Sequence, residues 1–348
     1  MVPVAPRGSP ENGGAVPRTS QETRDEILRH MDQAETQRFH WTATIVSGMG
    51  FFTDAYDLFV IALVIPLLER LYPEAAGSLS LDLSILAAAA LVGAVIGQVL
   101  FGYLADHLGR KRIYGVELAV MSVGAVGSAL AFPVLGLSTI LVVAMWRFLM
   151  GVGIGGDYPM SATIMSEFSN VRNRGRFVAS VFAMQGFGLL AGAFVMIVSL
   201  LLFPSGATLD IVWRVVLGAG AIPAIATIFF RRRMPETPRF TLAVKGDARG
   251  AAQDVQQLTG ASLTPVQTTL RAERQPLGVF FRKYGRVLLG TALSWFLLDM
   301  AFYSSNIFNP RVLDIIGFVT IGLSLHAQIL TLAEGQAVIA LLSLVPGY

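Results

Sequence analysis

The chain has 348 residues, of which 54% are hydrophobic and 14% are charged, and its formal net charge is +3. Because a soluble domain usually carries about 25% charged residues, this composition excludes an ordinary water-soluble protein. The absence of cysteine excludes disulfides and thiolate-bound metals. Residues 83–105 and 177–203 contain no charged side chain, and about 20 apolar residues cross a bilayer as a helix. We therefore predict an all-α, multi-spanning membrane protein.

The predicted elements begin with residues 1–38, a polar segment rich in Pro, Gly, Ser and charge that is typical of a disordered cytoplasmic tail. It has no signal-peptide pattern, so the first span is expected to direct membrane insertion. The apolar stretches predict spans near 41–68, 82–105, 113–132, 138–165, 176–203, 211–230 and 287–306, with a last apolar segment at 332–348. The expected domains are a six-helix bundle over 39–231, a cytoplasmic loop over 232–285 and an incomplete second bundle over 286–348.

The distribution of basic residues predicts the orientation. The tail and the expected inner loops, which include 110–112 and 231–286, hold 22 of the 26 Lys and Arg residues. The outer loops between the first six spans hold only Arg70. Because cytoplasmic loops carry an excess of Lys and Arg, the N-terminus is expected in the cytoplasm.

Charged side chains inside the predicted spans are the candidate functional residues, because an ionisable group at bilayer depth by default faces a cavity. They are Asp54, Asp57, Glu117, Arg147, Asp157 and Asp299. Asp54 and Asp57 are three residues apart and share a helix face. Two carboxylates that lie so near each other in partly dehydrated surroundings are difficult to ionise together, so a reversibly bound proton is expected there. Glu117 and Asp157 could continue a proton relay. Arg147 is the available counter-charge, and its partner is left open.

Three motifs resemble those of the major facilitator superfamily. The stretch 102–112 has the pattern G-x-L-x-D-x-x-G-R-K-R, which ends in the basic run that Arg110 opens. Gly102 and Gly109 permit a tight reversal, and Asp106 can cap a helix start or pair with a neighbouring arginine. Arg147 opens an R-x-x-x-G-x-G stretch, and residues 235–240 read P-E-T-P-R-F. The resemblance implies an all-α membrane fold of two six-helix halves.

A longer string, 155–167, reads G-G-D-Y-P-M-S-A-T-I-M-S-E and resembles the signature of fungal and plant phosphate:proton symporters. Residues 52–59 in the first span resemble the same family. Pro159 disturbs the helix just after Asp157 and Tyr158, and transporters place substrate sites at interrupted helices. The resemblance implies proton-coupled import of inorganic phosphate by alternating access, at the plasma membrane.

The resemblance also implies roles for individual residues. The substrate-binding residues it implies are Tyr158, Gln185, Trp295, Asp299 and Tyr303, and the proton-coupling residues are Asp54, Asp57, Glu117 and Asp157. Trp295, Asp299 and Tyr303 share one helix face by their spacing. Asp299 could accept a hydrogen bond from dihydrogen phosphate, which sulfate cannot donate, or it could itself be protonated before phosphate binds. Both mechanisms remain open at this point.

Seven spans and part of an eighth, against twelve in the family, predict that the chain is a fragment, and the family's tenth-span asparagine has no counterpart. Two rivals stay open: a proton-coupled symporter of sugars or other organic solutes, and a phosphate receptor or non-transporting regulatory fragment. No enzymatic constellation, cofactor or metal site is expected. The expected partners are inorganic phosphate, protons and the lipid bilayer, not nucleic acid, and the sequence does not indicate an oligomeric state.

Overall fold

A computed structural model describes residues 20–33, 35–73, 79–259, 276–320 and 322–347. Within these ranges no β-strand forms, and seven helical segments are long and apolar enough to cross a membrane. Hydrogen bonding explains this, since a helix satisfies all of its backbone groups internally and lipid offers no partner for them. The predicted all-α membrane fold is confirmed.

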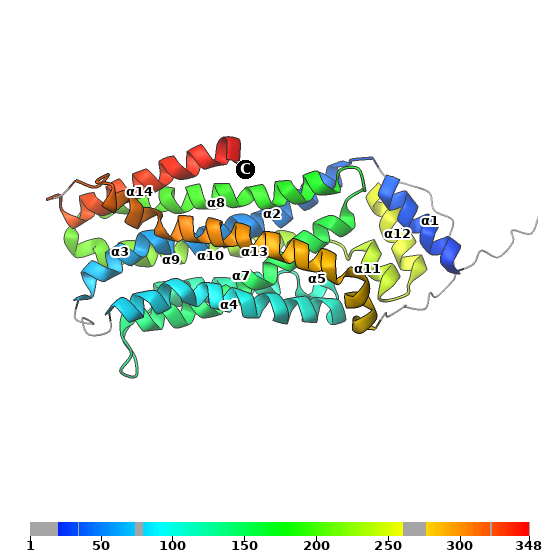
Figure 1. The fold of residues 1–348 in the computed structure, drawn as a ribbon, viewed down its shortest axis with the longest axis horizontal. Helices are drawn as coiled ribbons and strands as arrows, with labels where there is room; N and C mark the ends of the chain where they lie inside the picture. The colour runs from blue at the N-terminus through cyan, green and yellow to red at the C-terminus, as the bar shows by residue number, and fades with distance from the viewer. Residues whose placement is uncertain (1–19, 34, 74–78, 260–275, 321, 348) are drawn as a thin grey trace, which may run out of the picture.

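The long helices lie roughly along one long axis (Figure 1). In chain order the helices are α1 (Ser20–Gln33), α2 (Arg38–Phe59), α3 (Ile61–Leu71), α4 (Leu79–Leu108), α5 (Arg110–Ile113), α6 (Val116–Ala129), α7 (Thr139–Phe168), α8 (Arg174–Leu202), α9 (Leu209–Ala219), α10 (Ala221–Arg231), α11 (Pro238–Ala243), α12 (Ala248–Thr259), α13 (Leu277–Ile315) and α14 (Leu325–Leu342). The short helices α1, α5, α11 and α12 gather at one end of the molecule, which is the end that carries the basic loops.

Glycines allow α4 and α7 to pack closely. A side chain at Gly93 or Gly97 of α4 would overlap the backbone of α7 at residues 148 and 152, and one at Gly151 or Gly155 would overlap the backbone of α4. Close backbone approach of this kind is how small residues stabilise helix pairs in lipid, where apolar burial gives no driving force. The rigid α4–α7 pair holds the middle of α7 in place.

Three helix boundaries differ from the prediction. The seventh span was expected over 287–306, but α13 extends over Leu277–Ile315, because a helix continues beyond the apolar stretch that crosses the bilayer. Likewise, α14 begins at Leu325, before the apolar segment predicted from residue 332. Ser324 caps its first turn by accepting a hydrogen bond from the backbone N–H of Ala327. The third span is shorter than expected: α6 starts only after Gly115, whose φ of +115° interrupts the helix.

Part of the segment predicted to be a disordered tail is folded. Residues 20–33 form α1, whose buried Ile27 and Met31 pack against buried side chains of α12 such as Ala251 and Val255. The prediction was wrong for these residues because an amphipathic stripe of a few apolar side chains suffices once a partner helix is available. Residues 1–19 lie outside the described residues.

Candidate functional site

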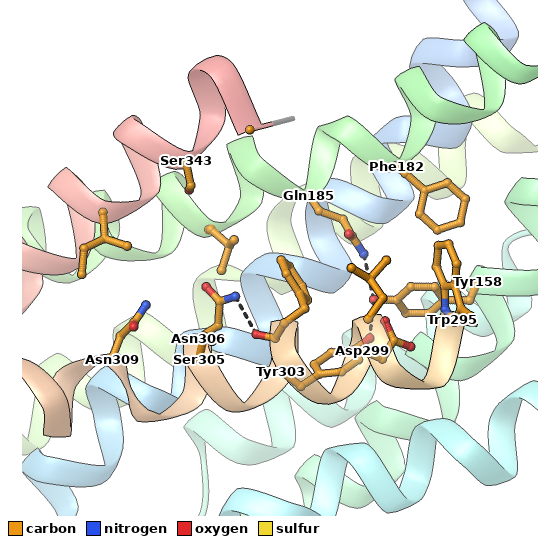
Figure 2. A pocket seen from close by; sticks show the side chains of 15 residues that line it. Tyr158, Phe182, Gln185, Trp295, Asp299, Tyr303, Ser305, Asn306, Asn309 and Ser343 are labelled. Carbon is orange, nitrogen blue, oxygen red and sulfur yellow. Dashed lines mark hydrogen bonds between the residues drawn. The ribbon is translucent and has the colours of Figure 1, made fainter. Parts of the chain in front are cut away.

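A cavity of about 520 Å³ opens between α7, α8, α13 and the end of α14. The five residues predicted to bind substrate all line this cavity: Tyr158, Gln185, Trp295, Asp299 and Tyr303. Figure 2 shows Tyr158, Gln185, Asp299 and Trp295 close together at one end of it. The consecutive helices α7 and α8 and the distant helix α13 therefore contribute to one chamber. The interruption expected at Pro159 is not seen, because α7 continues as one helix from Thr139 to Phe168 with Pro159 inside it.

Tyr158 is the centre of the hydrogen bonds in the cavity. Its hydroxyl accepts one hydrogen bond from the Gln185 side-chain amide at 3.0 Å and another from the Tyr303 hydroxyl at 3.1 Å. The Tyr158 ring packs edge-on against Phe51, with ring centroids 4.9 Å apart, which fixes its rotamer. Two helices, α8 and α13, are thus joined through one hydroxyl of α7.

Further polar side chains line the same cavity and were missed from sequence. They are Ser305, Asn306, Asn309 and Ser343. The side-chain amide of Asn306 donates a hydrogen bond of 2.8 Å to the backbone carbonyl of Phe302. The spacing of Asp299, Asn306 and Asn309 along α13 repeats the helical period, and this signal could have indicated them. No Lys, Arg or His is among the residues that line the cavity in the described part of the chain, and its polar groups are hydroxyls, side-chain amides, the Trp295 indole and the Asp299 carboxyl.

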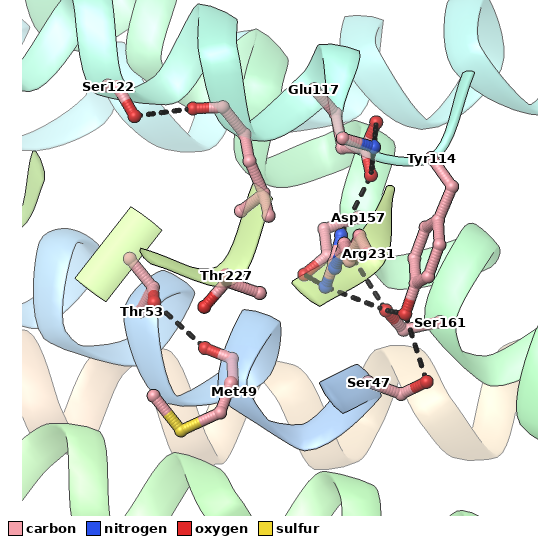
Figure 3. Close-up of polar contacts among 12 residues, drawn as sticks. Ser47, Met49, Thr53, Tyr114, Glu117, Ser122, Asp157, Ser161, Thr227 and Arg231 are labelled. Carbon is pink, nitrogen blue, oxygen red and sulfur yellow. Dashed lines mark hydrogen bonds and ion pairs between the residues drawn. The ribbon is translucent and has the colours of Figure 1, made fainter. Parts of the chain in front are cut away.

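A buried ion cluster lies beside this cavity, centred on Arg231 at the end of α10 (Figure 3). The Arg231 guanidinium contacts Glu117 of α6 at 2.8 Å and Asp157 of α7 at 2.7 Å, and all three side chains are fully buried. Ser161 donates to Asp157 at 2.6 Å and accepts from Arg231 at 3.1 Å. The Arg231 guanidinium also lies 4.1 Å above the Tyr114 ring.

Arg231 is a functional candidate that the sequence did not single out: it ends the expected six-helix bundle and was counted only among the basic residues of 231–286. It is the first of three consecutive arginines that follow an apolar helix, and nothing in their pattern separates it from Arg232 and Arg233. The structure buries Arg231 and exposes the other two. The last turn of α10 thus places the Arg231 guanidinium inside the bundle, where it pairs with two carboxylates.

Asp54 connects the ion cluster to the cavity. Its side chain is fully buried beside Asp157, and no donor among the described residues hydrogen-bonds either of its oxygens. It also interacts electrostatically with the hydroxyls of Tyr158 and Tyr303. A carboxylate without a donor is costly in a buried site, whereas a neutral carboxyl can donate to Asp157.

Asp57 has a different environment, although it lies one turn from Asp54 on α2. It interacts electrostatically with Arg147 of α7, whose guanidinium donates to the backbone carbonyl of Asp57 at 2.8 Å. This answers the open question of the partner of Arg147. Arg147 is not the counter-charge of Glu117 and Asp157, because Arg231, which the sequence did not single out, pairs with both.

The G-x-L-x-D-x-x-G-R-K-R stretch forms a clamp at the end of the bundle that carries the basic loops. Arg110 pairs with Asp106 at 3.2 Å and with Glu167, near the end of α7, at 3.3 Å. Gly109 has a φ of +99°, which L side chains rarely adopt, so the predicted tight reversal is confirmed at this position. Gly102, by contrast, lies within α4 with no neighbour within 4 Å of an added side chain, and it makes no reversal.

Helices of this length around a cavity with a few convergent polar side chains are typical of a membrane transporter, and the comparisons with known proteins give the family. The family model described as sugar (and other) transporter matches residues 42–333, and the chain belongs to this family. The solved structure of the xylose transporter XylE of E. coli, partially occluded and inward open, has a TM-score of 0.66 over 88% of this chain and 70% of its own, at 19% identity. A likeness at that identity establishes the fold alone.

Curated relatives are more similar in sequence. Inorganic phosphate transporter 1-4 of Arabidopsis thaliana is 43% identical over 93% of this chain and 66% of its own length. The low affinity inorganic phosphate transporter 1 of Petunia hybrida is 41% identical over 93% of this chain and 66% of its own length. The chain thus spans about two thirds of the length of these relatives. The predicted resemblance to phosphate transporters of the major facilitator superfamily is confirmed.

Proposed function

We propose that the chain is a secondary active transporter, or the N-terminal part of one, that imports inorganic phosphate together with protons by alternating access. The observation that carries this proposal is the placement of Asp54: a buried carboxyl without a donor lies between the cavity hydroxyls and the Arg231 ion cluster. A substrate in the cavity and a proton on Asp54 would then lie next to one another. The relatives named as phosphate transporters support phosphate as the substrate.

The cavity suits dihydrogen phosphate better than a fully ionised oxyanion. Gln185, Tyr158 and Tyr303 already hydrogen-bond to one another and can turn these donors to phosphate oxygens. Dihydrogen phosphate keeps two donors of its own, one of which can pair with the Asp299 carboxylate. Sulfate has no such donor and would leave Asp299 with the Trp295 side chain as its hydrogen-bond partner in the cavity.

The alternative mechanism, in which Asp299 is protonated before phosphate binds, makes a different prediction. If Asp299 accepts from the substrate, Asp299→Asn weakens phosphate binding at every pH. If Asp299 must be neutral for phosphate to bind, the Asp299→Asn variant should bind phosphate at acidic pH as tightly as the wild type does. At neutral pH the variant should keep this affinity, whereas the wild type should bind phosphate more weakly. Phosphate affinity of the purified chain in lipid nanodiscs, measured for both proteins at both pH values, separates the two mechanisms.

The proposed orientation places the N-terminus in the cytoplasm of a cell whose plasma membrane holds the protein. The basic residues of the clamp, such as Arg110 and Lys111, and the helices α1, α11 and α12 lie at one end of the bundle (Figure 1), as the excess of Lys and Arg in cytoplasmic loops requires. A protease added outside intact cells should therefore leave an N-terminal tag uncleaved, and cleavage of the tag would contradict this orientation.

Uptake of radioactive phosphate by phosphate-transport-deficient cells tests the function itself. We expect uptake that rises as the external pH falls, that excess sulfate does not inhibit, and that Asp54→Asn removes. Tyr284→Phe, on an exposed part of α13, is the matched control and should transport normally. Binding of phosphate without any uptake would favour a receptor or a non-transporting partner, and uptake of xylose or glucose in place of phosphate would favour a sugar symporter.

A further inference from the structure

The buried cluster contains more acid than base. Arg231 is faced by Glu117 from α6, by Asp157 from α7 and by the Tyr114 ring, and Asp54 from α2 also interacts with it electrostatically. Three carboxyls and one guanidinium would leave two uncompensated negative charges in a fully buried site. An isolated buried charge costs several kcal/mol, so the cluster has to hold at least one proton.

The hydrogen bonds decide which carboxyl holds that proton. Asp157 receives both guanidinium nitrogens of Arg231, at 2.7 and 2.9 Å, and the hydroxyl of Ser161. Glu117 receives Arg231 and the backbone N–H of Gly115, each at 2.8 Å. Charge-assisted donors of this kind stabilise the ionised carboxylate. Asp54 has none.

We infer that Arg231 is a positioning residue of the proton path: it holds Asp157 and Glu117 as carboxylates, so that the exchangeable proton resides on Asp54 beside the cavity hydroxyls. When the proton moves inward, the O–H bond of Asp54 breaks, an O–H bond forms on Asp157, and Asp54 becomes the carboxylate. Arg231 then keeps Glu117 as its partner, so no step leaves the guanidinium unpaired. The part of this proton in transport rests on the proposed function.

The space around Arg231 supports a positioning role. Gly50 of α2 leaves the room that its guanidinium occupies, since a side chain there would overlap both Arg231 and the Asp157 carboxylate. Four separate elements, α2, α6, α7 and α10, therefore meet at one side chain. The contrast is Arg147, which contacts the backbone carbonyls of Asp57 and Leu58 and serves a different acid.

Infrared difference spectroscopy of the purified chain in lipid nanodiscs, without phosphate, tests this inference through the carbonyl stretch of protonated carboxyls. We expect Asp54→Asn to remove one such band from the wild-type spectrum. Arg231→Gln should add a second protonated carboxyl, so that the intensity from this cluster rises about two-fold. That added band should disappear when Asp157→Asn or Glu117→Gln is combined with it.

Two further variants exclude a merely structural effect. Arg231→Lys keeps the positive charge and should retain the wild-type bands, and Arg232→Gln, at the exposed neighbouring position, should leave them unchanged. A folded Arg231→Gln protein without an added band would overturn the inference, as would an Asp54→Asn spectrum identical to that of the wild type. If Arg231→Gln does not fold, the double variant Arg231→Gln/Asp157→Asn removes one charge of each sign and should show one protonated carboxyl, as the wild type does; two such bands, or none, would overturn the inference.

The result is independent of the substrate. Phosphate binding to the same nanodisc sample is measured in parallel. The expected bands without phosphate binding would refute the proposed substrate and retain the role of Arg231, whereas phosphate binding without the expected bands would refute the role of Arg231 alone.

Discussion

The hydroxyl of Tyr303 on α13 donates a hydrogen bond of 3.1 Å to the hydroxyl of Tyr158 on α7, across 145 residues of sequence. Both side chains line the cavity, and both interact electrostatically with Asp54. The six-helix part of the chain and α13 are therefore connected at the place where substrate and proton would meet. A ligand that draws Tyr303 away from Tyr158 would change both connections at once.

Removing the Tyr158 hydroxyl should weaken phosphate binding more than removing that of Tyr303. Tyr158 orients the donors of two neighbours, Gln185 and Tyr303, whereas Tyr303 makes one of these bonds. A neutral hydrogen bond contributes about 1 kcal/mol, so Tyr303→Phe should cost roughly five- to ten-fold in affinity and Tyr158→Phe more than ten-fold. Isothermal titration with phosphate measures both. Equal affinities of the two variants would contradict the central position of Tyr158.

Neutralising Asp157 should destabilise the protein much more than neutralising its neighbour Asp54. Asp157→Asn leaves Arg231 with one carboxylate in place of two, and breaking a buried ion pair costs about 3–5 kcal/mol. Asp54→Asn removes no hydrogen bond from a donor, and its new amide can donate to Asp157. Thermal unfolding in detergent should show a clear loss for the first variant and little change for the second. Comparable losses would mean that Asp54 is ionised and paired.

Substitutions of two glycines by alanine distinguish the effect of close packing on stability from the effect of helix propensity. A side chain at Gly50 would collide with Arg231 and Asp157, whereas one at Gly102 would meet nothing within 4 Å. Gly50→Ala should therefore cost about 1–3 kcal/mol of stability by overpacking. Gly102→Ala should raise stability by about 0.5–1 kcal/mol, because alanine favours the interior of α4. The midpoints of thermal unfolding compare the two, and a destabilised Gly102→Ala protein would assign that glycine a contact that the fold does not show.

The docking of α1 can be tested by proteolysis. Met31 is buried against α12, and truncating a buried methionine to alanine costs about 2–5 kcal/mol. Met31→Ala should release α1 and speed tryptic cleavage at the exposed Arg29 by ten-fold or more. Gln33→Ala, at an exposed position of the same helix, is the control. Unchanged cleavage of Met31→Ala would show that the ion pairs of Asp32 with Arg174 and Arg239 suffice to hold α1.

Much of the candidate site could be predicted from short sequence motifs. The resemblance to phosphate symporters implied five substrate-binding side chains, and the fold brings all five to one cavity. The helical period added that Trp295, Asp299 and Tyr303 share one face, and the cost of placing a charge in lipid singled out Asp299. The boundaries of α6 and α13 were less accessible, because hydropathy marks where a helix meets lipid and not where its hydrogen bonds end.

By itself, the sequence determined that this protein is an all-α membrane protein, because about 20 uncharged residues in a row can satisfy their backbone groups in lipid as a helix. The transporter type was implied by the resemblance of its motifs to a known family. It could not determine how the buried charges pair. Asp54 and Asp57 are equivalent by spacing, as are Arg231, Arg232 and Arg233 by composition. Only the packing of α2, α6, α7 and α10 assigns Arg231 to Glu117 and Asp157 and Arg147 to Asp57, because the energy of a charge depends on which partner lies within a few ångströms of it.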